Sequence, residues 1–171
     1  MTMNGVVDLL IPRGGRSLIR AVVDNATVPV IETGAGNCHV YVEKSADIET
    51  ALSIVFNAKM QRPSVCNAAE SLLVDRDIAP VFLPLLKERM PDVEYRGCAE
   101  TQAILKDISP ATDEDFYTEY NDYIMSVKVI DGVDEAIAHI NAHNTKHSEC
   151  IVTCNTFAAE RFTAGIDAAA V

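Results

Sequence analysis

The sequence has few basic residues, no long apolar run and no basic leader. Lys and Arg number 14 against 25 Asp and Glu, so the formal net charge is -11. A surface with this charge repels phosphate backbones and anionic lipids, which argues against nucleic-acid and membrane partners. No apolar stretch reaches the length of a membrane span, and the N-terminal MTMNG lacks the character of a signal peptide. We therefore expect a cytoplasmic protein that binds neither nucleic acid nor membranes.

The cysteines do not form a disulfide framework. Their number is odd and their spacing is irregular, and a reducing compartment keeps such residues as free thiols. The question that they raise is whether one of them is a nucleophile. The five cysteines are Cys38, Cys66, Cys98, Cys150 and Cys154.

What the chain does contain is alternating strand-like and helix-like segments. With 171 residues, 49% hydrophobic and 23% charged, it fits one globular domain by length, and the order of segments predicts an α/β fold. The acidic stretch 112–119 is predicted as a surface loop. Residues 167–171 are predicted to begin another buried strand, from which we expect a truncated chain. Predicted strands are 6–12, 28–32, 38–43, 71–75, 93–97, 123–130 and 150–154, and predicted helices are 17–24, 48–60, 78–90, 133–144 and 156–164.

Cys66 is the cysteine best placed for chemistry. It lies in QRPSVCNAAE, where Pro63 and several small residues predict a loop just before a strand. A nucleophilic thiol needs room for a substrate and a lowered pKa, and both are easier to obtain at such a junction than within a core helix. The alternative is a small buried hydrophobic residue, which is the usual role of an isolated cysteine. Cys150 and Cys154 are expected to face the core.

Two further segments are candidate sites. Glu32, in VIETGAGNCH, ends an apolar strand and precedes glycines that allow a ligand to approach closely, although a carboxylate there can also cap the next element. Arg13, Gly14 and Gly15 lie between a predicted strand and a helix, where unpaired amides at a helix N-terminus favour phosphate. The alternative for that segment is an ordinary tight turn.

Three histidines recur at a spacing of four and are followed by a cysteine, which raises the question of zinc. The sequence NTK interrupts the helix before the last histidine, and no further ligand is well placed. We therefore expect no metal site, and we expect solvated or capping histidines near the end of a helix. The residues concerned are His139, His143, His147 and Cys150.

Long ordered motifs resemble one enzyme family. IPRGGRSLI, VPVIETGAGNCHVYVEKSAD, FNAKMQRPSVCNAAESLLVD, TEYNDYIMSVKVIDGVDEAIAHIN and HNTKHSECIVTCN are similar to the γ-glutamyl phosphate reductases (glutamate-5-semialdehyde dehydrogenases) of the aldehyde dehydrogenase superfamily. The resemblance implies a three-layer α/β/α catalytic domain with a mainly parallel sheet, together with a βα piece of the nucleotide-binding domain. It implies residues 1–33 as a partial cofactor-binding segment and 34–171 as a truncated catalytic domain.

The resemblance also implies roles for single residues. Cys66 matches the catalytic thiol, Glu32 a general base, and Glu119 a glutamate that holds the nicotinamide ribose, while Arg13, Gly14 and Gly15 fall at the cofactor-side turn. The implied reaction is the NADPH-dependent reduction of L-glutamate 5-phosphate to the semialdehyde in proline biosynthesis.

Partners and activity follow from the same resemblance. A homo-oligomer is expected, and glutamate 5-kinase is a further partner that the family suggests. Because such reductases are longer than this chain, we expect the chain to be inactive alone. The alternative is a catalytically silent module that keeps the fold for interaction or regulation.

Overall fold

The computed structural model describes residues 2–32 and 35–171, and it divides the chain into two compact units, Met1–Ala35 and Gly36–Val171. The boundary that we predicted between residues 33 and 34 lies outside the described residues. Each unit has its own secondary structure and is described by itself.

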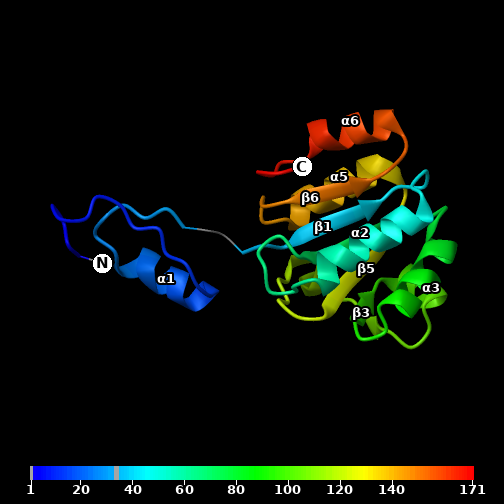
Figure 1. Ribbon diagram of the computed structural model, residues 1–171, viewed down its shortest axis with the longest axis horizontal. Helices are drawn as coiled ribbons and strands as arrows, with labels where there is room; N and C mark the ends of the chain where they lie inside the picture. The colour runs from blue at the N-terminus through cyan, green and yellow to red at the C-terminus, as the bar shows by residue number, and fades with distance from the viewer. Residues whose placement is uncertain (1, 33–34) are drawn as a thin grey trace. The chain divides into compact units, whose positions relative to one another are not determined.

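The larger unit is built on a six-stranded sheet with the order β4-β3-β5-β2-β1-β6. Figure 1 shows β6, β1, β5 and β3 following one another from top to bottom. Every pairing within the sheet is parallel. Parallel strands need a crossover between them, and helices supply most of these crossovers. This arrangement confirms the predicted α/β class. The strands are β1 (Cys38–Val42), β2 (Ala69–Asp75), β3 (Glu94–Gly97), β4 (Ser109–Pro110), β5 (Ile124–Ile130) and β6 (Glu149–Val152).

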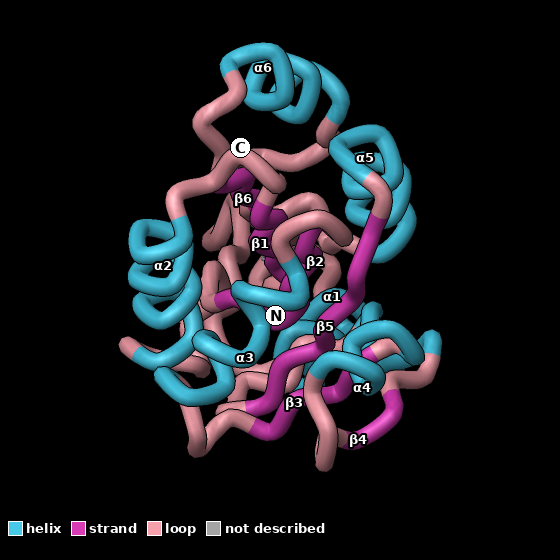
Figure 2. Tube along the Cα trace, turned by 90° about the vertical axis from the view of Figure 1, so that its right-hand side faces the viewer, coloured by secondary structure: helices cyan, strands magenta, loops and turns pink. Residues whose placement is uncertain are grey.

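Helices cover both faces of this sheet (Figure 2). Successive side chains of a strand point to opposite faces. Val40 and Val42 therefore pack in one apolar cluster with α2 and α3, whereas Tyr41 packs in a second cluster with α5 and α6. The result is the predicted three-layer α/β/α unit. The helices are α2 (Ile48–Met60), α3 (Ala79–Arg89), α4 (Ala99–Ile104), the 3-10 helix η1 (Asp113–Tyr117), α5 (Gly132–His143) and α6 (Thr156–Gly165).

Local signals fix several helix starts. The Asp47 side chain accepts a hydrogen bond from the Thr50 amide at 2.9 Å and so caps α2. Pro80 lies in the first turn of α3, where its missing N–H costs nothing. Among the described helices, none combines the length and apolar character needed to cross a bilayer.

The smaller unit contains the helix α1 (Arg16–Asn25), close to the predicted 17–24. The strands predicted at 6–12 and 28–32 are wrong, because only one parallel bridge forms there, between Leu10 and Val30. A continuous apolar run predicts a strand that is buried on both faces, yet Val6 is 74% exposed. A unit of this size offers one helix for the run to pack against, so most of its apolar side chains stay in solvent.

Other predictions in the larger unit need correction. The acidic stretch 112–119 contains η1, and α4 and β4 were not predicted. Cys154 does not face the core: β6 ends at Val152, and Cys154 lies beyond it on the surface. Residues 167–171 form a single bridge, between Ser148 and Ala170, where a buried strand was expected.

Candidate functional site

The candidate site in the larger unit lies at the amino ends of β1, β2 and β5. Gly36 leads into β1, Cys66 lies in the turns before β2, and Glu119 belongs to the segment before β5. Because these three strands are parallel neighbours, their amino ends share one edge of the sheet. Ligands of open parallel sheets usually bind at the opposite, carboxyl edge. The amino edge is therefore an unusual position for a site, and the contacts there decide which residues belong to it.

Cys66 occupies a tight turn and is exposed. The turn is held by hydrogen bonds from the Val65 amide to the Arg62 carbonyl (3.3 Å) and from the Ala68 amide to the Val65 carbonyl (2.9 Å). This placement agrees with the predicted loop before a strand. The thiol is thus accessible to a substrate, while its backbone is anchored on both sides.

The backbone of Gly36 lies directly against that of Cys66. A Cβ atom at residue 36 would fall 1.7 Å from the Cys66 carbonyl oxygen and 2.6 Å from its carbonyl carbon. No side chain fits in that space, so only glycine allows the two segments to approach so closely. Gly36, the last residue of the motif ETGAG, therefore allows this segment to pack against the Cys66 turn.

Glu119 is tied to the same glycine. Its Oε1 accepts a hydrogen bond from the Gly36 amide at 2.7 Å. The side chain is half-buried. The structure thus brings Glu119 and Cys66, two of the predicted site residues, to either side of one glycine.

Cys38 is the second thiol near this turn, and its chemistry differs from that of Cys66. Burial, followed by the nearby Glu149 carboxylate, raises the pKa of the Cys38 thiol to about 12. A thiol with this pKa remains protonated at neutral pH, and Cys38 donates to the Cys66 carbonyl oxygen at 3.3 Å. Cys38 therefore supports the turn and is not itself suited to nucleophilic attack.

The segment that leads to Glu119 is fixed by Asp115. This carboxylate accepts hydrogen bonds from Arg96 (2.8 Å), from the Tyr120 hydroxyl (2.8 Å) and from the Thr112 amide (2.7 Å). Burial alone would raise the pKa of Asp115, but these hydrogen bonds outweigh it, with Arg96 foremost, and hold the pKa far below its usual range.

This depressed pKa predicts acid sensitivity. A carboxyl group whose pKa is lower in the folded state stabilises the fold above its unfolded pKa, near 4, and loses that contribution as the pH falls. We expect Asp115→Asn to remove roughly 2 kcal/mol at pH 7 and to have a smaller effect at pH 2. Urea unfolding of both proteins at several pH values measures this difference. A loss that is independent of pH would contradict it.

The remaining predicted site residues belong to the smaller unit. Glu32 and Arg13 are exposed. Gly14 has φ = 150° and Gly15 is the N-cap of α1, whose first amides receive no side-chain cap. This turn offers unpaired helix amides, as the phosphate-site interpretation requires. These four residues belong to a different unit from Cys66, and their roles stay predictions.

The prediction of solvated or capping histidines is wrong for His139 but holds for His143, whose Nδ1 lies 2.7 Å from the His139 carbonyl oxygen in the last turn of α5. His139 is buried, with 6% of its surface exposed, so it is not solvated. Burial, followed by repulsion from His143 and Lys128, lowers its pKa to about 3 and keeps the ring neutral. Within residues 2–32 and 35–171, no group of three His, Cys, Asp or Glu side chains is arranged to hold a metal ion.

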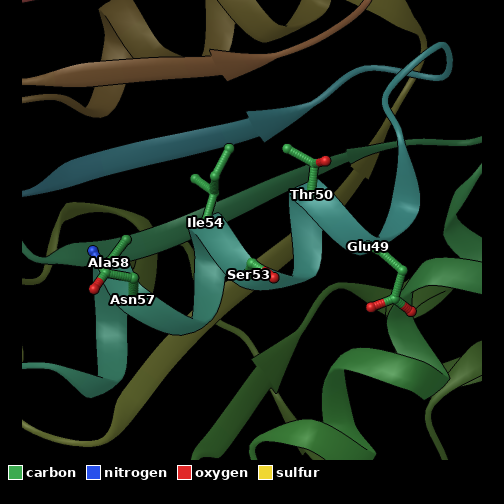
Figure 3. A pocket seen from close by; sticks show the side chains of 6 residues that line it. All are labelled: Glu49, Thr50, Ser53, Ile54, Asn57 and Ala58. Atoms are coloured by element: carbon green, nitrogen blue, oxygen red, sulfur yellow. The ribbon is translucent and has the colours of Figure 1, made fainter.

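A shallow hollow on the outer face of α2 is unrelated to the edge that carries Cys66. All of its lining residues come from this one helix, and Figure 3 shows their side chains along it. A binding site usually gathers polar groups from several segments. We therefore do not assign this hollow to the candidate site. Its lining consists of Glu49, Thr50, Ser53, Ile54, Asn57 and Ala58.

Comparison with known proteins extends over the whole chain. No family model matches it. The γ-glutamyl phosphate reductase of Clostridium acetobutylicum is 58% identical over 173 aligned residues, which include all of this chain and 41% of that protein. The crystal structure of the γ-glutamyl phosphate reductase of Thermotoga maritima superposes with a TM-score of 0.95 at 52% identity, covering 99% of this chain and 42% of that one. The resemblance to the γ-glutamyl phosphate reductases is confirmed.

More distant structures share the fold. A betaine aldehyde dehydrogenase of Staphylococcus aureus, solved in complex with NAD+, superposes with a TM-score of 0.77 at 16% identity, covering 96% of this chain and 43% of that one. The fold is therefore aldehyde-dehydrogenase-like, as predicted. The chain spans about two fifths of the length of the reductases that it matches.

Several residues around Cys66 were not predicted from the sequence. Gly36 was considered only as part of a glycine pair. Lys59 and Glu70, a buried ion pair close to the Cys66 turn, were not considered at all. A lysine near the end of an amphipathic helix normally projects into solvent, so its burial left no signal in the local pattern. The sign that the sequence did offer is that both residues lie within the long motif FNAKMQRPSVCNAAES.

Proposed function

We propose that this chain supplies the thiol-bearing part of an NADPH-dependent γ-glutamyl phosphate reductase, which converts L-glutamate 5-phosphate into L-glutamate 5-semialdehyde in proline biosynthesis. The observation that carries the proposal is the exposed Cys66 turn packed on Gly36, with Glu119 bound to the same glycine. Similarity to reductases of this name over the whole chain supports the choice of substrate.

In this mechanism Cys66 is the nucleophile. Its thiolate attacks the acyl carbon of the substrate, and the bond from that carbon to the phosphate oxygen breaks. Inorganic phosphate is released, and the acyl group remains on Cys66 as a thioester. Collapse of the reduced adduct, a thiohemiacetal, breaks the carbon–sulfur bond, regenerates the thiol and releases the semialdehyde. The amides of Cys66 and Asn67 donate to no acceptor within residues 2–32 and 35–171, so they are free to stabilise the oxyanion.

Glu119 is the proposed cofactor residue of the larger unit. Oε1 is occupied by Gly36, and Oε2 accepts no hydrogen bond from the described residues, which leaves it for a ribose hydroxyl. A carboxylate is a common partner of that hydroxyl in dinucleotide sites. NADPH, when bound, supplies the hydride that reduces the thioester. The NAD+ complex of the Staphylococcus aureus relative supports a nicotinamide cofactor.

The smaller unit has the complementary role in this proposal. Residues 1–33 form a partial cofactor-binding segment in which Arg13, Gly14 and Gly15 hold a phosphate at the N-terminus of α1, and 34–171 form the catalytic part. Glu32 occupies the position of a general base, but the reductive direction needs no water attack on the thioester. A cytoplasmic homo-oligomer, with glutamate 5-kinase as a further partner, completes the proposal.

Selective alkylation tests the proposed nucleophile. We expect iodoacetamide at neutral pH to label Cys66 at least about tenfold faster than Cys154, the other exposed cysteine, because an activated thiol reacts faster than an equally accessible ordinary one. Peptide mass spectrometry at timed intervals measures both rates in one sample. Equal rates would favour the catalytically silent module over the enzyme.

A further inference from the structure

A buried ion pair lies beside the candidate site and has no part in the proposed chemistry. Lys59, in the last turn of α2, places its Nζ 2.7 Å from Oε2 of Glu70 in β2, and their side chains are 0% and 1% exposed. Two buried charges lose their hydration, so such a pair is weak evidence of a stabilising role. The contacts of the pair therefore have to explain why it is present.

Glu70 also contacts the segment that follows Glu119. Its second oxygen, Oε1, accepts a hydrogen bond from the Asn121 amide at 3.0 Å. Asn121 has φ = 57°, the left-handed conformation that asparagine tolerates better than most residues. One carboxylate thus joins the strand entered from the Cys66 turn to the segment that carries Glu119.

This link acts together with the one through Gly36. Residue 119 is bound to the Gly36 amide, and residue 121 is bound to Glu70. Two attachments on either side of one residue restrict both the position and the direction of the segment between them. Lys59 occupies the remaining oxygen of Glu70 and so orients the carboxylate toward Asn121.

We propose that Glu70, oriented by Lys59, is a positioning residue that holds the Glu119 segment in register with Cys66. The inference rests on the proposed function, because it assigns to Glu70 the alignment of a cofactor-binding carboxylate with the catalytic thiol. Glu70 touches neither substrate nor cofactor. Its effect passes through the Asn121 amide.

Two double variants isolate the acceptor for Asn121. Lys59→Met/Glu70→Leu removes the charges and the acceptor, whereas Lys59→Met/Glu70→Gln removes the charges and keeps an amide oxygen at the same place. Both avoid an unpaired buried charge, so the comparison does not depend on the cost of breaking an ion pair. Asp75→Asn, at the carboxyl edge of the same sheet, controls for general loss of stability, because its partner Tyr41 lies far from the amino ends of the strands.

Hydrogen exchange of the Asn121 amide in the 171-residue chain gives the first measurement. We expect exchange at least about tenfold faster in the leucine double variant than in the glutamine one, with Asp75→Asn close to the unsubstituted chain. Equal exchange in the two double variants would overturn the inference.

Turnover gives the second measurement, in the Clostridium acetobutylicum reductase with this chain in place of its matching segment. We expect the leucine double variant to lower kcat about 100-fold, because a misplacement of about 1 Å has that effect on an aligned reaction, while the glutamine variant stays within about threefold. Iodoacetamide reactivity of Cys66 should be equal in both, because that reagent does not need Glu119. Selective Cys66 labelling with equal kcat for the two variants would overturn the inference alone, whereas unselective labelling of the unsubstituted chain would overturn the proposed function.

Discussion

Replacing Cys66 by alanine is expected to abolish turnover in a full-length reductase that carries this segment. Without the thiol, no thioester forms, and removal of a covalent nucleophile typically lowers kcat by on the order of 10⁴-fold or more. The assay is NADP+ reduction in the presence of the semialdehyde and phosphate, with the chain placed in the Clostridium acetobutylicum reductase. Binding of the cofactor should remain, since Cys66 is not proposed to hold it.

Cys154→Ala is the matched control for that experiment. Both cysteines are exposed, but Cys154 lies beyond β6, at the opposite end of that strand from the amino edge of the sheet. We expect its replacement to leave kcat within about twofold. A Cys66→Ala enzyme with more than a tenth of the original activity would remove Cys66 from the mechanism.

Gly36→Ala is expected to have the second largest effect. The new methyl group would overlap the Cys66 carbonyl, 1.7 Å from its oxygen, and neither partner is a flexible side chain that can turn away. The backbone must shift, which we expect to cost about 3 kcal/mol and to lower Tm by roughly 6 to 12 °C. Because the shift moves Cys66 relative to Glu119, kcat in the full-length enzyme should also fall by about 100-fold.

Gly165→Ala separates this overlap from the general effect of adding a methyl group. Its Cβ would lie 2.9 Å from Cδ1 of Ile137, the far end of a side chain that can rotate. We expect a change in stability of less than about 1 kcal/mol and no change in kcat. Thermal unfolding followed by circular dichroism compares the two variants. Similar Tm values for both would contradict a special contact at Gly36.

The sequence predicted the larger unit well, because most of its elements have a clear local pattern. The β-branched and apolar run of β1 and the apolar spacing of α5 each determine one structure. The short elements α4 and β4 were missed, since six and two residues are too few to establish a period. For the run 6–12 the error was the opposite one, a predicted strand that does not form. Its composition is that of a buried strand, but burial depends on neighbours that local sequence does not specify.

The site could be predicted only in part for the same reason. The turn around Cys66 follows from Pro63 and its small neighbours, and the structure has that turn. The approach of Gly36 to Cys66, and of Glu119 to Gly36, joins segments that are distant in sequence, and only the strand order brings them together. The charges of Lys59 and Glu70 would have been placed in solvent by any local criterion.

The direction of the strands has a consequence for how a phosphorylated substrate can be bound. Helices that connect parallel strands run opposite to them, so α2 and α5 end at the edge where Cys66 lies. The C-terminal end of a helix carries partial negative charge and repels anions. Lys59 is the basic residue in the last turn of α2, but its charge is paired with that of Glu70. In the proposed reaction, the field of these two helix ends therefore favours the departure of phosphate from this edge.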